Sequence, residues 1–146
     1  MEESISLLRK LQKEFECEEV DLRNYSPLTL AFLGDCVFDL IIRTVIVERG
    51  NRAAESLHKK KSAIVKAQTQ AQMAESILES LSEEELAIYK RGRNAKSYTT
   101  AKNASVTDYR KATGFEALLG YLYLQNKEDR IIELIKLALE QTGMSI

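Results

Sequence analysis

The sequence predicts an all-α fold built as a single helical domain. Only one proline and six glycines interrupt the 146 residues, and the residues between them are mostly good helix formers such as Leu, Ala, Glu, Lys and Gln. Apolar residues also recur at spacings of three and four, which is the period of a helix. Hydrophobic residues make up 45% of the chain and charged residues 29%, a composition that excludes a disordered protein.

Capping residues and apolar periodicity set the expected helices. Ser26 with Pro27, Ser62, and Ser82 in the capping box SEEE each mark a helix start. In chain order, we expect helices over residues 4–15, 27–49, 51–61, 63–78, 83–91, 107–126 and 129–141.

The chain is expected to form one domain, at residues 26–146, after a helical leader at residues 1–25 that ends in acidic residues. A length of 146 residues supports one core and is too short for two. The N-terminus lacks the pattern of a signal peptide, and no apolar run approaches the ~20 residues of a membrane span. We therefore expect a cytoplasmic protein that makes no contact with a membrane.

Cysteine and histidine content limits the chemistry that the chain can perform. Cys17 and Cys36 show neither metal-ligand spacing nor a disulfide framework, so two free thiols are expected. His58 is the single histidine, which excludes a histidine-rich metal site. Any hydrolytic chemistry must therefore rest on carboxylates and on what they bind.

Two apolar helices carry carboxylates in unusual places. The run FLGDCVFDLII contains Asp35 and Asp39 in a helix that is apolar nearly all round, and Glu116 is the only charge between residues 112 and 124. A buried, ionised carboxylate without a partner costs several kcal/mol, so a cation or hydrogen bonds must compensate its charge.

Glycines accompany both acids. Gly34 directly precedes Asp35, and Gly120 lies four residues after Glu116 on the same helix face. Glycine in mid-helix costs ~1 kcal/mol against alanine, so both positions indicate a close approach of backbones or a ligand.

Each acid taken singly has a simpler explanation. It can lie at the core boundary and point to solvent or pair with a lysine, and Asp39 fits this explanation best. However, each of two helices has an acid near a glycine, and this repetition favours one site that both acids share. We expect Asp35 and Glu116 to converge on a divalent cation such as Mg²⁺, which prefers oxygen ligands.

The net charge of the chain is close to zero, but one segment is strongly basic. Between residues 86 and 115 there are seven bases against one acid, Asp108. The bases are Lys90, Arg91, Arg93, Lys96, Lys102, Arg110 and Lys111.

The stretch KRGRNAKS at residues 90–97 is expected to be a loop that contacts backbone phosphates. The simpler alternative is a solvated loop without a specific partner. HKKK at residues 58–61 is a weaker signal, because a charge run usually marks an exposed helix end. The candidate RNA contacts are Lys90, Arg91, Arg93, Asn94, Lys96 and Lys60.

Four motifs together, LAFLGDCVFDL, LHKKKS, KRGRNAKS and YRKATGFEALLGYLYL, resemble the Mini-ribonuclease III family over about residues 28–141. This family is essentially a ribonuclease III catalytic domain without a double-stranded RNA-binding domain. The resemblance implies a ribonuclease III-like all-α fold, a homodimer with a cleft across it, and Mg²⁺-dependent hydrolysis of double-stranded RNA, with Mn²⁺ as a substitute metal. It also implies a role in maturation of the large-subunit ribosomal RNA precursor.

By position in the motifs, Asp35 and Glu116 match the family's catalytic residues and, as we hypothesise, hold the metal. Larger relatives carry further acids where this chain has Leu28, Ala31 and Thr113, so two protein carboxylates remain per site. The hypothesised chemistry is in-line attack by a metal-activated water, with the basic segment positioning the phosphate.

Two other functions remain open. A ribonuclease III-like module could bind duplex RNA without cutting it, and a nuclease assay with and without chelator separates these two. A helical protein–protein adaptor is the third candidate, and it predicts no salt-sensitive RNA binding.

Overall fold

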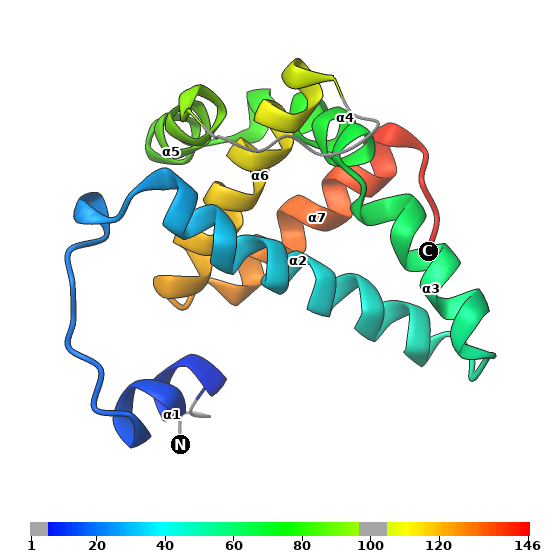
Figure 1. Ribbon diagram of the computed structural model, residues 1–146, viewed down its shortest axis with the longest axis horizontal. Helices are drawn as coiled ribbons and strands as arrows, with labels where there is room; N and C mark the ends of the chain where they lie inside the picture. Colours follow the sequence, from blue (N-terminus) through cyan, green and yellow to red (C-terminus); the bar gives the residue numbers. More distant parts are fainter. Residues whose placement is uncertain (1–5, 97–104) are drawn as a thin grey trace.

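The computed structural model describes residues 6–96 and 105–146, and in these ranges the chain is helical without any strand. The all-α prediction is therefore confirmed (Figure 1). The α-helices are α1 Leu7–Glu14, α2 Pro27–Glu48, α3 Ala54–Val65, α4 Ala67–Ile77, α5 Glu83–Asn94, α6 Val106–Leu124 and α7 Glu128–Thr142. Short 3₁₀ turns occupy Leu22–Asn24 and Leu78–Ser80.

Most helices begin where a side chain caps them. The Ser26 hydroxyl accepts a hydrogen bond from the Thr29 N–H at 3.1 Å, and Pro27 occupies the first turn of α2. At the start of α5, the Ser82 hydroxyl accepts from the Glu85 N–H at 3.1 Å, while the Glu85 carboxylate accepts from the Ser82 N–H at 2.9 Å. The predicted capping box is confirmed.

The boundary between α3 and α4 differs from the prediction. Ser62 does not start a helix, because α3 continues to Val65 and the break lies at Lys66. Two side chains of α4 explain this position. The Thr69 hydroxyl donates to the Ala63 carbonyl at 2.9 Å, and the Gln70 amide donates to the Val65 carbonyl at 2.7 Å. These bonds satisfy carbonyls at the end of α3, where the helix leaves them free.

The C-terminal end of α5 also differs from the prediction. Residues 90–94 of the segment KRGRNAKS are helical, not loop. Gly92 is buried, and a Cβ atom at this position would lie 2.8 Å from the Cα of Gly114 and 2.9 Å from the Cβ of Ala117. The glycine therefore allows close packing of α5 on α6 and does not break the helix.

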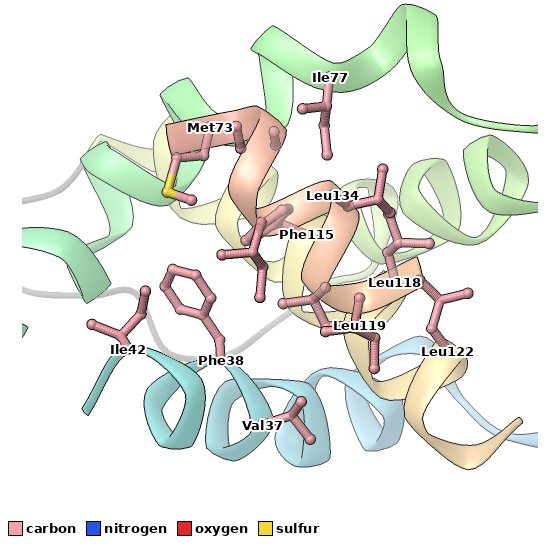
Figure 2. Packing of buried hydrophobic residues seen from close by; sticks show 14 of the residues in the cluster. Val37, Phe38, Ile42, Met73, Ile77, Phe115, Leu118, Leu119, Leu122 and Leu134 are labelled. Atoms are coloured by element: carbon pink, nitrogen blue, oxygen red, sulfur yellow. The ribbon is translucent and has the colours of Figure 1, made fainter. Parts of the chain in front are cut away.

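The core forms around α6, which contacts α2, α4 and α5 extensively. Figure 2 shows Phe38 of α2 pointing toward Phe115 among other apolar side chains of the cluster. The rings of Phe38 and Phe115 pack edge to face, with centroids 5.5 Å apart.

The leader helix α1 lies at the edge of the molecule, joined to α2 by an extended segment (Figure 1). Within the described ranges, no helix is both long and apolar enough to span a bilayer. Cys17 and Cys36 are free thiols, as predicted, and both are exposed.

Candidate active site

The crossing of α2 and α6 builds the candidate site. A Cβ atom at Gly34 would lie 1.7 Å from the backbone oxygen of Glu116, and one at Gly120 would lie 2.0 Å from the backbone oxygen of Leu30. No side chain larger than hydrogen fits at either position without moving a helix. The close approach expected from the two glycines is confirmed, and it sets Asp35, next to Gly34, beside Glu116.

The two acids interact directly. Burial first, then a hydrogen bond with Asp35 and repulsion from the Asp35 charge, together raise the pKa of Glu116 to about 9. Asp35 is exposed and Glu116 is partly buried, so the pair opens to solvent on the Asp35 side. Near neutral pH the Glu116 carboxyl therefore keeps its proton and shares it with Asp35.

The donor chemistry of this pair fits a hard divalent cation. In the described part of the chain, neither acid forms an ion pair with a lysine or arginine. A cation between them would replace the shared proton and remove the repulsion, and carboxylate oxygens are ligands that Mg²⁺ and Mn²⁺ accept. No cluster of three or more metal-ligating side chains occurs among the described residues, so this site offers two protein carboxylates.

Asp39, one turn after Asp35, belongs to a different interaction. Its carboxylate lies 2.6 Å from Nε of Arg43 and 3.7 Å from Nζ of Lys61. The prediction that Asp39 is a boundary acid paired with a basic residue is confirmed.

The predicted RNA contacts at the end of α5 lie close to this crossing. Gly92 packs against Gly114 and Ala117, which flank Glu116 in sequence, so the last turns of α5 lie beside the Glu116 segment of α6. Lys90 and Lys96 are exposed to solvent there.

The arginines and Asn94 of this segment have partners within the protein. Arg91 donates from Nη2 to the Tyr25 carbonyl at 3.4 Å. The Arg93 guanidinium lies 5.8 Å from the Tyr89 ring centroid and donates from Nε to the Asn94 side chain at 3.3 Å. Lys102, another base of the predicted segment, lies outside the described residues.

On α3 the two neighbouring lysines Lys60 and Lys61 have different surroundings, and the predicted RNA contact of Lys60 stays a prediction. Lys60 is exposed and makes no ion pair within the described residues, whereas Lys61 turns toward α2. Sequence reasoning missed Lys61 and Arg43. The four-residue spacing of Asp39 and Arg43 is a readable signal for their pairing. Nothing in the run HKKK distinguishes the lysine that faces the core.

Comparisons with known proteins bear on the family and the fold of this chain. The model of the ribonuclease III domain matches residues 28–127. Mini-ribonuclease 3 of Clostridium tetani is 45% identical over 133 residues, 90% of this chain and 88% of the relative. Mini-ribonuclease 3 of Brevibacillus brevis is 46% identical over 128 residues, 88% of this chain and 94% of the relative.

A crystal structure of a protein from Fusobacterium nucleatum has a TM-score of 0.77 to this chain at 35% identity, covering 84% of this chain and 99% of that one. The helical fold, the domain match and the identity to relatives over most of their length lead to one conclusion. The chain belongs to the Mini-ribonuclease 3 family and carries a ribonuclease III domain.

Proposed function

We propose that this protein is an endoribonuclease that hydrolyses double-stranded RNA with a divalent metal, Mg²⁺ or Mn²⁺, held by Asp35 and Glu116. Membership of the Mini-ribonuclease 3 family supports the endoribonuclease class. One observation carries the residue assignment. Two acids from different helices face each other at a glycine crossing, and the described protein supplies no basic side chain to neutralise them.

Different residues of the chain would bind the metal and the phosphate. Asp35 and Glu116 present oxygens on the solvent side of the crossing, and both must be ionised to hold a cation. When bound, such an ion acts as a Lewis acid and lowers the pKa of a coordinated water. Arg91, Arg93 and Lys96, at the neighbouring end of α5, would bind the phosphodiester and oppose its growing negative charge.

The proposal extends to the substrate, the assembly and the place of action. The exposed lysines and arginines of the described residues suit the phosphate backbone of a duplex, which is recognised by basic side chains more than by aromatic stacking. The resemblance to the family supports the large-subunit ribosomal RNA precursor as substrate, a homodimer as the active form and the cytoplasm as the location. Dimerisation would double the basic surface of the ribonuclease III domain and so raise its affinity for RNA.

The purified protein should cut long duplex RNA in the presence of Mg²⁺, and EDTA should stop the reaction. Single-stranded RNA and duplex DNA serve as substrate controls. Asp35→Asn and Glu116→Gln should each abolish cleavage while RNA binding and folding persist. Glu79→Gln, at an exposed acid in the turn Leu78–Ser80, is the matched control and should cut normally.

Each outcome has a definite meaning. Full activity of Asp35→Asn or Glu116→Gln would refute the catalytic assignment. Salt-sensitive binding without cleavage by the wild type would mean a non-catalytic duplex-binding module. For the ribosomal role, the terminal stem of the large-subunit precursor should be cut at defined positions and faster than an unrelated duplex of equal length.

A further inference from the structure

A second charged cluster lies one helical turn from the candidate active site. Asp39 is contacted by two bases, Arg43 at 2.6 Å and Lys61 at 3.7 Å, so the three side chains carry one net positive charge. Asp35 and Asp39 are four residues apart on α2, which places them on one face about 6 Å apart along the helix axis. The cluster therefore continues the face that carries the catalytic pair.

Lys61 is unusually placed for a lysine. Its side chain is only 15% exposed, and it reaches α2 from α3. The distance of 3.7 Å to Asp39 is too long for a hydrogen bond, and no other acid among the described residues pairs with its ammonium group. A largely enclosed lysine side chain whose ammonium group makes no hydrogen bond within the described residues favours an anionic ligand.

The cluster borders a hollow between α2 and α3 with a volume of ≈ 360 Å³. Basic side chains form one part of its wall and apolar side chains the rest. The lining residues are Arg43, Ile46, Val47, Ala54, Leu57, His58 and Lys61. Cations beside an apolar surface match the two parts of a sugar–phosphate backbone, the charged phosphate and the less polar ribose.

We propose that Lys61 and Arg43 bind an RNA backbone phosphate that flanks the scissile bond, and that Asp39 holds both bases in position until RNA arrives. The inference rests on the proposed function, because it places the substrate strand along α2 from Asp35 toward Arg43. It assigns duplex RNA contacts to the groove between α2 and α3, in addition to the end of α5.

Binding of a short RNA duplex, measured by fluorescence anisotropy in EDTA, separates affinity from cleavage. Lys61→Gln should weaken binding about fivefold to tenfold near 0.1 M salt and reduce the slope of log K against log [salt] by about one. Arg43→Gln should act in the same direction. Lys59→Gln removes the same charge from the same helix, but residue 59 lies about 200° around the helix from residue 61 and pairs with Glu55. It should change neither quantity.

The variant Asp39→Asn distinguishes two roles of Lys61: binding of an RNA phosphate, and an ion pair that only joins α2 and α3. If Lys61 binds RNA, removal of the competing carboxylate should strengthen RNA binding about twofold or more, although the link between α2 and α3 is lost. If the ion pair only joins the helices, Asp39→Asn and Lys61→Gln should weaken binding alike. Circular dichroism and thermal unfolding confirm that each variant is folded.

The results also distinguish this inference from the proposed function. A wild type that cuts duplex RNA, together with unchanged affinity and salt slope for Lys61→Gln, would overturn the inference alone. A wild type that neither binds nor cuts duplex RNA would overturn both.

Discussion

The proton on Glu116 determines how the candidate site responds to pH. Its pKa of about 9 reflects burial first and then the neighbouring Asp35. A cation can occupy the pair only when this proton leaves, so metal binding must release a proton below pH 9.

The affinity for Mg²⁺ without RNA should therefore rise with pH, by about tenfold per unit between pH 6 and pH 8. Isothermal titration calorimetry in two buffers of different ionisation enthalpy should report release of about one proton per metal ion. Glu116→Gln should bind Mg²⁺ weakly and without this pH dependence. Equal affinities of the wild type at pH 6 and pH 8 would contradict the assignment of the proton.

The raised pKa of Glu116 also affects folding. In the folded protein this carboxyl binds its proton more tightly than at its ordinary pKa of 4.5, so the free energy of unfolding falls as the pH rises from 4.5 to about 9. Glu116→Gln removes this penalty. Its melting temperature should exceed that of the wild type by several degrees at pH 8, at about 2–4 °C per kcal/mol for a chain of this size, and the difference should vanish near pH 4. Thermal unfolding by circular dichroism at both pH values provides the measurement, and a lower melting temperature of the variant at pH 8 would contradict the expected sign.

At the residue scale, the convergence of the two acids was predictable from the sequence, whereas the orientation of the lysines was not. Asp35 and Glu116 were predictable because a charge in an apolar helix needs an explanation, and Asp39 because it could pair with a base. Lys61 was not predictable from a run of three lysines. Which of them faces α2 depends on how α3 packs, and packing is a tertiary property.

At the scale of helices, the crossing of α2 and α6 depends on two glycines, Gly34 and Gly120, which have no Cβ atom at the contact. Gly34→Ala would set a methyl group 1.7 Å from the Glu116 carbonyl oxygen, and Gly120→Ala would set one 2.0 Å from the Leu30 carbonyl oxygen. Each obstacle is helical backbone, so the helices must move apart. We expect a loss of about 2–4 kcal/mol in the free energy of unfolding for each variant, together with weaker Mg²⁺ binding as the two acids separate.

Gly50→Ala is the matched control for these substitutions. A Cβ atom at Gly50 would meet only the flexible side chain of Arg52, at 3.4 Å, so stability should change by less than about 0.5 kcal/mol. Urea unfolding measures all three variants. A Gly34→Ala protein as stable as Gly50→Ala would show that the crossing tolerates a side chain and that the glycines do not position the acids.

The helices themselves were predictable where local signals decide them. Ser26 with Pro27 and the capping box at Ser82 fixed two starts, because a cap depends on residues within one turn. The break at Lys66 depends on hydrogen bonds from Thr69 and Gln70 that return from the next helix. Gly92 led to the wrong prediction of a loop. In the sequence alone, a glycine that ends a helix cannot be distinguished from a glycine that packs against a neighbouring helix.

At the scale of the whole molecule, contacts between distant segments were beyond prediction. Glu85 was recognised as part of a cap, yet its carboxylate also accepts hydrogen bonds from Arg130 of α7 at 2.8 and 2.9 Å. Arg130 in addition donates to the Ser80 carbonyl at 2.8 Å. This ion pair joins the start of α5 to α7 and is set by the final packing of the helices.

The apolar outer face at the start of α2 bears on the assembly of the molecule. Phe32 is 84% exposed and Leu28 is 38% exposed, and the four-residue spacing places both on the same side of the helix. Such exposure of a phenylalanine is costly unless another surface covers it. Phe32 is also three residues before Asp35, so a partner subunit seated here would lie beside the pair of Asp35 and Glu116.

We therefore expect the wild type to be a dimer in solution and Phe32→Glu to be a monomer, because a buried carboxylate at the interface would lack a partner. Light scattering after size-exclusion chromatography, at equal protein concentrations, measures the mass. Ile132→Glu, at a 54% exposed apolar residue of α7, makes the same chemical change elsewhere and should leave the dimer intact. Cleavage of duplex RNA by Phe32→Glu should fall together with the dimer fraction, since each subunit then binds with only half of the basic surface. A monomeric wild type, or a Phe32→Glu protein that remains a dimer, would show that this face of α2 is not the interface.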